Sequence, residues 1–281
     1  MTSFLAQLNN PQFLILHVLG PILFGACIGS FLNVCIYRMP LNRSVVSPRS
    51  RCFTCGIALP WQVNIPIFAW FLLRGRCSCQ LTKLSFRYPL VEFLTAFLTL
   101  WVWNLFPMAE ALIYLLFCYA LIVATFIDID HFIIPDEISL GGCVVGLLLS
   151  TLVPQLHGAT SHLGGFVHSL IGLLFGGGLL IVIAVGGKLL LRKEAMGMGD
   201  IKLVAAMGAF LGWQAPLFII AVSSMLGSII GIGLMIQKQR RWGIKMPFGP
   251  FLAIAAIIYV LHGHEWMAQY LGLFQTLSPS P

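Results

Sequence analysis

The segment Thr125-Phe-Ile-Asp-Ile-Asp-His-Phe-Ile-Ile-Pro-Asp136 places three carboxylates, those of Asp128, Asp130 and Asp136, at the end of a long apolar run. The whole chain has only nine acidic residues, so this clustering is pronounced. Because a carboxylate loses hydration at the edge of a bilayer, such a cluster predicts a functional site. A second segment, Gly197-Met-Gly-Asp200, opens another apolar run with an aspartate that follows two glycines. Since glycine allows a second polypeptide to approach the backbone, we expect the two segments to meet.

The composition places the chain in lipid. Hydrophobic residues make up 59% of its 281 residues, charged residues make up only 9%, and the mean hydropathy is +0.94. These values are typical of a polytopic membrane protein. The net charge of +7 would indicate nucleic acid binding in a soluble domain, but in a membrane protein the positions of the basic residues matter first. We therefore predict the lipid bilayer as a partner and no nucleic acid.

Eight apolar runs predict an all-α polytopic membrane protein with about eight transmembrane helices. The sixth run is short for a full crossing, and its glycine-rich start suggests that it begins inside the membrane plane. The predicted organisation is a first transmembrane helix over residues 1–38, a cytoplasmic loop domain over 39–87, and a seven-helix membrane domain over 88–281 that carries the aspartates. The eight runs cover approximately residues 13–36, 88–106, 110–127, 138–154, 162–187, 201–213, 216–236 and 248–262.

The positions of the sixteen Lys and Arg residues predict the orientation. They all fall in, or at the edges of, connections that alternate to one side of the membrane, and the positive-inside rule makes that side the cytoplasm. Both termini then lie outside. Asp128, at the inner end of the third run, and Asp200, at the inner start of the sixth, share one depth and one face. The N-terminus lacks a basic region and a small-residue cleavage site, so we expect the first run to be retained.

The loop domain is too small to bury a large core, and domains of this size usually need a metal or disulfides. Cys52, Cys55, Cys77 and Cys79 have a spacing that resembles a four-thiolate zinc site, although the second pair is C-x-C. The alternatives are two disulfides or four idle thiols, and a reducing cytoplasmic face argues against disulfides. The remaining cysteines lie in apolar runs and are assigned to packing: Cys27, Cys35, Cys118 and Cys143.

Two carboxylates that share a site cannot both ionise cheaply, so one keeps a proton while the other activates water. This is the logic of an aspartyl protease. Asp200 is one expected partner, but Asp128 and Asp130 cannot be separated by spacing, because residues two apart on a helix point roughly 200° apart. Asp136 follows a proline at a helix start, where we expect an N-capping side chain.

The motifs Asp128-Ile-Asp-His, Ile134-Pro-Asp136 and Gly197-Met-Gly-Asp200-Ile-Lys-Leu together resemble those of the type IV prepilin peptidases, the bacterial GxGD aspartic proteases. The resemblance covers nearly the whole chain. It extends to Gly29-Ser-Phe-Leu-Asn33, Tyr37-Arg38, the cysteine loop, Asn64-Ile-Pro66, Arg74-Gly-Arg76, Arg87-Tyr-Pro-Leu-Val-Glu92 and Pro247-Phe-Gly-Pro250.

The resemblance implies Asp128 and Asp200 as the catalytic pair, with Gly197 and Gly199 supporting the catalytic loop. It implies prepilins or type II secretion pseudopilins as substrates, whose basic leader is cleaved after a glycine at the cytoplasmic face of the bacterial inner membrane. Members with the long cysteine-bearing loop also methylate the new N-terminus with S-adenosylmethionine, so a second, methyltransferase activity is expected here.

Two further features of the sequence each have two possible interpretations. Main-chain groups at Pro247, Phe248, Gly249 and Pro250 are candidates for pairing with the substrate backbone, or the segment merely starts the last helix. Glu92 lies in the first turns of a helix, where the positive helix end favours it, or it serves methyl transfer.

Two other classes of function are open to these residues. Paired acids in a membrane could form the ion or proton path of a transporter, although we find no repeat between the halves and the acids cluster at one interface. A membrane scaffold organised by the zinc loop is the other. The sequence does not indicate which pilin system the chain serves, where the methyl donor binds, or the oligomeric state.

Overall fold

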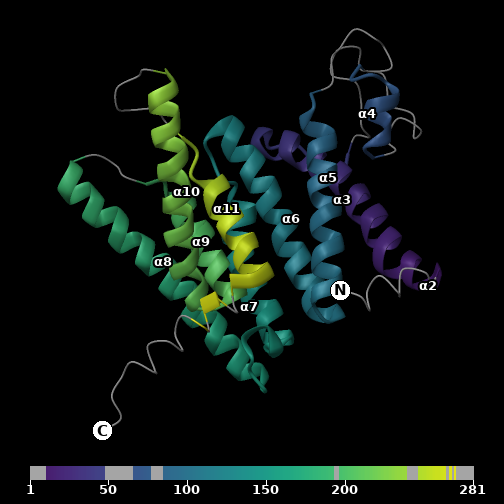
Figure 1. The fold of residues 1–281 in the computed structure, drawn as a ribbon. Coiled ribbons are helices and arrows are strands. Elements are labelled where there is room, and N and C mark those ends of the chain that lie inside the picture. Colours follow the sequence, from purple (N-terminus) through teal and green to yellow (C-terminus); the bar gives the residue numbers. More distant parts are fainter. Residues whose placement is uncertain are drawn as a thin grey trace. The chain divides into compact units, whose positions relative to one another are not determined.

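The computed structural model describes residues 11–47, 66–76, 85–192, 196–238, 246–263, 266–267 and 269 (Figure 1). The chain divides into two compact units, Met1–Val123 and Ala124–Pro281, and the boundary falls inside helix α6 (Met108–His131). The described residues form helices at all eight apolar runs, which confirms the predicted all-helical class.

The first unit is built on two long helices, α3 (Gly20–Arg38) and α5 (Arg87–Leu105). Phe106 adopts an extended conformation after α5, which ends that helix and allows α6 to follow two residues later. The described elements of this unit, in chain order before α6, are α2 (Pro11–Leu14), the π-helix η1 (Ile15–Leu19), α3 (Gly20–Arg38), the 3₁₀ turn η2 (Met39–Leu41), α4 (Phe68–Leu72) and α5 (Arg87–Leu105).

Helices α3 and α5 pack closely because α3 presents two glycines at a spacing of four. A Cβ added to Gly29 would lie 2.6 Å from the Cα of Glu92, and one added to Gly25 would overlap the side chain of Thr99. Small residues of this spacing allow helix backbones to approach each other in lipid, where no hydrophobic force joins helices. The Thr99 hydroxyl lies 2.7 Å from the hydroxyl of Tyr119 on α6, which adds a polar contact inside the unit.

In the second unit, the central helix is α9 (Met198–Leu211). It packs against α7 (Asp136–Leu152) and α8 (His162–Leu191). Apart from Lys202, the residues of α9 from Ile201 to Phe210 are buried. The other elements of the unit, besides the end of α6, are α7 (Asp136–Leu152), the 3₁₀ turn η4 (Pro154–His157), α8 (His162–Leu191), α10 (Gln214–Lys238), α11 (Gly249–Ile258) and the π-helix η5 (Tyr259–Gly263).

Backbone meets backbone where α8 crosses α9. A Cβ added to Gly172 would overlap the carbonyl of Gly208, and one added to Gly208 would overlap the carbonyl of Gly172. On α7, Gly146 plays a similar part, since a Cβ there would lie 2.9 Å from the Cβ of Ala209. Glycines on three helices therefore determine how deeply α9 is enclosed.

The C-terminal end of α9 is held by side chains from its neighbours. The Ser150 hydroxyl of α7 and the Ser169 hydroxyl of α8 both donate to the carbonyl of Ala209, at 3.1 Å and 2.7 Å. His157 in η4 lies 3.0 Å from the Ser150 hydroxyl, and burial lowers its pKa to about 4. The neutral imidazole can therefore donate to Ser150, while Ser150 donates onward to Ala209.

Five spans in the described part of the chain are long and apolar enough to cross a membrane. This confirms a polytopic membrane protein. The helices α7, α9 and α11 with η5 are shorter than these spans, as the length of the sixth run predicted for α9. The five spans are Pro11–Leu41, Arg87–Leu105, Met108–His131, His162–Leu190 and Gln214–Ile236.

Replacing Gly172 by alanine should separate α8 from α9 and destabilise the protein by about 1–3 kcal/mol, because the methyl group has no room against Gly208. Gly178 lies on the same helix with no atom within 4 Å of an added Cβ, so Gly178→Ala is the matched control. The measurement is the midpoint of thermal unfolding in detergent. Equal midpoints for the two variants would contradict the close packing described above.

Candidate active site

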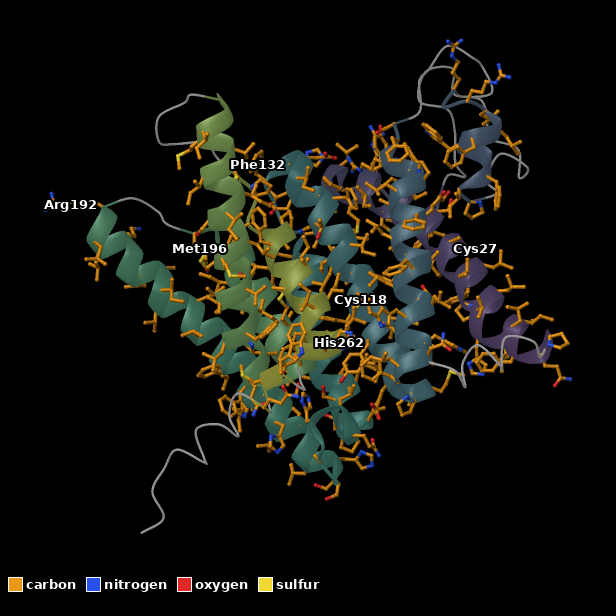
Figure 2. The ribbon with its side chains drawn as sticks, in the orientation of Figure 1. Cys27, Cys118, Phe132, Arg192, Met196 and His262 are labelled. Atoms are coloured by element: carbon orange, nitrogen blue, oxygen red, sulfur yellow. The ribbon has the colours of Figure 1, made fainter. Side chains whose placement is uncertain are left out.

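Asp128 lies in the last turn of α6 and is only 5% exposed, whereas Asp130 is exposed. The structure therefore separates two aspartates that spacing could not distinguish. The helix ends at His131, and the N–H of Phe132 still donates to the Asp128 carbonyl at 2.9 Å. Phe132 then adopts a left-handed conformation (φ 56°), which turns the chain toward Ile134 (Figure 2).

Asp200 lies in the first turn of α9 and is half-buried. The chain enters this helix from Met196, marked in Figure 2, through an extended Gly197 at the N-cap position. The backbone amide of Gly197 interacts with the Asp200 carboxylate. Gly199 approaches the segment that follows α6, since a Cβ there would lie 3.2 Å from the Cβ of Ile134. Gly197 therefore contacts Asp200 itself, and Gly199 allows the start of α9 to approach the segment after Asp128.

The structure brings Asp128 and Asp200 together. The two side chains lie close enough for their charges to interact, so the carboxylate of Asp128 repels that of Asp200. Both residues belong to the second unit, and both are withdrawn from water compared with Asp130. Because the two carboxylates repel each other, ionising both costs more free energy than ionising one.

A third group completes the pair. The N–H of Gly249 donates to the Oδ2 atom of Asp128 at 2.9 Å in a buried setting. A Cβ at position 249 would lie 2.7 Å from the same oxygen, so only glycine fits there without a shift. Gly249 is the first residue of α11, and its N–H is one of the free donors of a helix start. This confirms the interpretation in which the Pro247–Pro250 segment starts the last helix. The first N–H group of that helix binds the carboxylate of Asp128.

The sequence did not reveal the contact between Gly249 and Asp128, which joins residues 121 positions apart. A signal was present in the glycine itself, because it lies between a phenylalanine and a proline at a helix start where bulkier residues are usual. That signal indicates that the position is crowded, but it does not indicate that Asp128 is the residue in contact with it. The carbonyl of Phe248 is also used inside the protein, since it accepts from Phe251 and Leu252.

Asp136 has a role other than the predicted cap. The N-cap position of α7 is Pro135, and Asp136 is the first helical residue. Its carboxylate accepts a hydrogen bond from the Nζ of Lys202 at 2.8 Å, which makes an ion pair between α7 and α9. The prediction of an N-cap was therefore wrong by one position, because the proline already ends the extended segment. The ion pair ties the two acidic motifs together beside Asp200.

The four cysteines predicted to bind zinc lie outside the described residues. Within the described ranges, no group of three or more His, Cys, Asp or Glu side chains could hold a metal ion. The assignment of the other cysteines to packing is confirmed for Cys35 and Cys118, which are buried. It is wrong for Cys27, which is exposed on α3 (Figure 2), while Cys143 is half-buried.

Comparison with known proteins gave two family matches. Residues 23–106 match the bacterial peptidase A24 N-terminal domain, and residues 115–232 match the type IV leader peptidase family. The second match contains both Asp128 and Asp200. No solved structure matches the chain significantly.

Similar proteins were found in several bacteria. A prepilin leader peptidase/N-methyltransferase of Aeromonas hydrophila is 39% identical, over 90% of this chain and 93% of the relative. One of Pseudomonas aeruginosa is 34% identical over 90% of this chain and 93% of its own length. A relative of the same name in Myxococcus xanthus is 38% identical over 77% of this chain.

The ion pair between Lys202 and Asp136 should contribute little to stability, because the Asp136 side chain is 63% exposed. A double-mutant cycle of Lys202→Ala and Asp136→Ala, followed by thermal unfolding, should give a coupling of about 0.2–1 kcal/mol. The coupling should decrease in high salt. A coupling that is several times larger, or unaffected by salt, would show that the pair is held in a dry environment.

Proposed function

The chain belongs to the type IV leader peptidase family, and we propose that Asp128 and Asp200 are its catalytic pair. The observation that carries this proposal is the meeting of the two motif carboxylates, with the Gly249 N–H on one of them. Family membership also decides against the transporter and scaffold alternatives. The activity is that of a leader peptidase with an associated N-methyltransferase.

The geometry supports a division of tasks within the pair. The Gly249 N–H binds Oδ2 of Asp128, and we assign the contacts with Asp200 and with the attacking water to the other carboxyl oxygen. One carboxyl group acts as the base that takes a proton from water, while the other donates a proton to the carbonyl oxygen of the scissile peptide. Water thereby adds to the carbonyl carbon and gives a gem-diol intermediate. The intermediate collapses when the protonated base gives its proton to the leaving nitrogen and the other carboxylate takes a proton back from a gem-diol hydroxyl. The proposed roles require no residue outside the second unit.

The proposed substrate is a prepilin or pseudopilin, which has a charged leader followed by an apolar helix. Cleavage after a glycine would occur at the cytoplasmic face of the inner membrane, where the expected eight crossings place both aspartates. The basic loops would repel a basic leader, so capture is proposed to use main-chain pairing. Gly197 and Met198 are exposed and suit this role, apart from the Gly197 amide, which interacts with Asp200. Gly249 and Phe248 suit it less, because their N–H and carbonyl groups are bonded within the protein.

The second activity is proposed from the names of the relatives, which include an N-methyltransferase. S-adenosylmethionine is the methyl donor that this activity implies, and it supplies an electrophilic methyl group to the new N-terminal amine. The cysteine loop is proposed to hold one structural zinc ion through Cys52, Cys55, Cys77 and Cys79. Four thiolates are a donor set that suits zinc, and the metal would replace the core that so short a loop lacks.

Asp128→Asn and Asp200→Asn should each reduce leader cleavage by roughly a thousandfold or more, because a pair that shares a proton fails when either member is lost. The assay mixes the purified protein with a prepilin in detergent and follows the shorter product. Asp130→Asn is the matched control, since Asp130 lies two residues away and is exposed. Substantial cleavage by either single variant, with the protein folded, would refute the assignment.

Protein purified without chelators should contain one zinc ion per chain by elemental analysis. Replacing Cys52 and Cys55 by serine should remove the metal and should affect methylation more than cleavage, because both aspartates lie in the other unit. Cys27→Ser is the control, since this exposed thiol is on α3 and outside the loop. Absence of zinc from the wild-type protein would contradict the proposal.

A further inference from the structure

Glu92 is a buried carboxylate that the peptidase mechanism does not use. It lies in the second turn of α5 and is only 8% exposed, with apolar side chains before and after it along the helix. Burying a carboxylate in such surroundings costs several kcal/mol, on the order of the whole stability of a small domain, unless hydrogen bonds compensate. Its hydrogen-bond partners therefore indicate what the residue is for.

One partner is a main-chain group of the loop domain. The N–H of Ile67 donates to Oε2 of Glu92 at 2.6 Å, and the hydroxyl of Ser30 on α3 also interacts with the carboxylate. A position in α5 is thus joined to a position 25 residues earlier in the chain. A helix end needs no such contact, so the helix-dipole explanation of Glu92 is incomplete.

The bonded turn is strained. Ile67 has a φ of 64°, in the left-handed region that β-branched residues rarely adopt. The N–H of Phe68 donates to the carbonyl of Pro66 at 2.6 Å, which closes a three-residue turn around Ile67. Such a conformation costs about 1–3 kcal/mol and persists only where the surroundings impose it. The hydrogen bond to Glu92 is a contact that can impose it.

The other side of the contact is rigid. Gly29 of α3 lies directly against the Cα of Glu92, so the two helix backbones are in close contact at this position. The side-chain amide of Asn33 donates to the carbonyls of Gly29 and Tyr88, at 3.2 Å and 3.1 Å, which fixes α3 to the start of α5. Glu92 therefore presents its carboxylate from a fixed position.

The turn determines where the next elements begin. Helix α4 starts at Phe68, directly after Ile67, and Trp70 packs edge-on against Phe86 with ring centroids 5.5 Å apart. Gly75 then turns the chain with a φ of 66°, with the Trp70 ring 3.0 Å from the position of an added Cβ. From here the chain leads to Cys77 and Cys79. The hydrogen bond between Glu92 and Ile67, which we call the clamp, therefore fixes the point from which α4 and the Gly75 turn begin.

We infer that Glu92 is a positioning residue for methyl transfer, which clamps the Pro66–Phe68 turn and so fixes the described part of the loop domain, residues 66–76, on α3 and α5. The inference rests on the proposed methyltransferase activity. The described contacts of Glu92 all lie in the first unit, and both catalytic aspartates lie in the second. Glu92 therefore affects methylation and leaves cleavage intact.

The test compares Glu92→Gln with Glu92→Ala. A glutamine carbonyl oxygen can still accept from the Ile67 N–H, whereas alanine cannot. Glu92→Ala should lower the methylation rate by about tenfold to a hundredfold, and Glu92→Gln should retain at least about half of it, as expected for a group that orients others. Leader cleavage should stay within about twofold of the wild type in both variants.

A second pair of variants tests the other partner. Ile67→Pro removes the donor N–H and imposes a negative φ, so it should reproduce the defect of Glu92→Ala. Ile67→Gly keeps the N–H and tolerates the left-handed conformation, so it should methylate within about twofold of the wild type. The clamp is refuted if Ile67→Pro methylates normally.

Hydrogen exchange separates this inference from the proposed function. Peptides that contain Ile67 should exchange faster in Glu92→Ala than in the wild type, and no faster in Glu92→Gln. If the wild-type protein cleaves but never methylates, the proposed second activity and the role given to Glu92 both fail, while the exchange data still decide whether the clamp exists. If Glu92→Gln is as defective in methylation as Glu92→Ala while its exchange is unchanged, the carboxylate acts chemically and the positioning role is wrong.

Discussion

A short helix enclosed among longer ones must satisfy its own ends, and this constraint organises the second unit. In lipid, a carbonyl at a helix terminus cannot turn to water, so it needs a donor from the protein. Helix α9 receives such donors at Ala209, from Ser150 and Ser169. Gly172 and Gly208 let the backbones of α8 and α9 touch, which brings the Ser169 hydroxyl within reach, and Gly146 lets α7 bring the Ser150 hydroxyl close in the same way. The position of Asp200 at the opposite end of α9 follows from this arrangement.

The helices could be predicted from the sequence because each apolar run has to satisfy its own backbone in lipid. The side chains that meet could not be predicted so well. Asp128 and Asp130 have the same chemistry and lie two residues apart on one helix, and tertiary packing decides which one is buried. The Gly249 N–H reaches Asp128 across 121 positions, and local pattern gives no indication of such a contact. Motif resemblance had already favoured Asp128, and the burial of its side chain supplies the physical reason.

The turn at Ile67 shows where local rules mislead. A β-branched residue between Pro66 and Phe68 predicts extended backbone, yet Ile67 is left-handed. The sequence gives no warning, because the group that binds this turn is a carboxylate 25 residues away. Disagreement between local preference and global structure is expected at functional or strained sites. The sequence allowed a structural or a catalytic explanation of Glu92. Its contact with Ile67 supports a third explanation, in which Glu92 positions other groups for methyl transfer.

Cleavage of a membrane-embedded peptide makes opposing demands on the site, since the carboxylates need a dry setting to share a proton and the reaction consumes water. The second unit meets both demands because its two aspartates are buried to different extents. Asp128 is buried at the end of a long helix, whereas Asp200 is half-buried at the start of a short one, directly after the exposed Gly197 and Met198. Water can therefore approach from the side of Asp200, and the Gly249 N–H holds Asp128 in place without adding a charge that would disturb the pair. A lysine or arginine in the position of that N–H would keep both carboxylates ionised, and the shared proton on which the proposed mechanism depends would be lost.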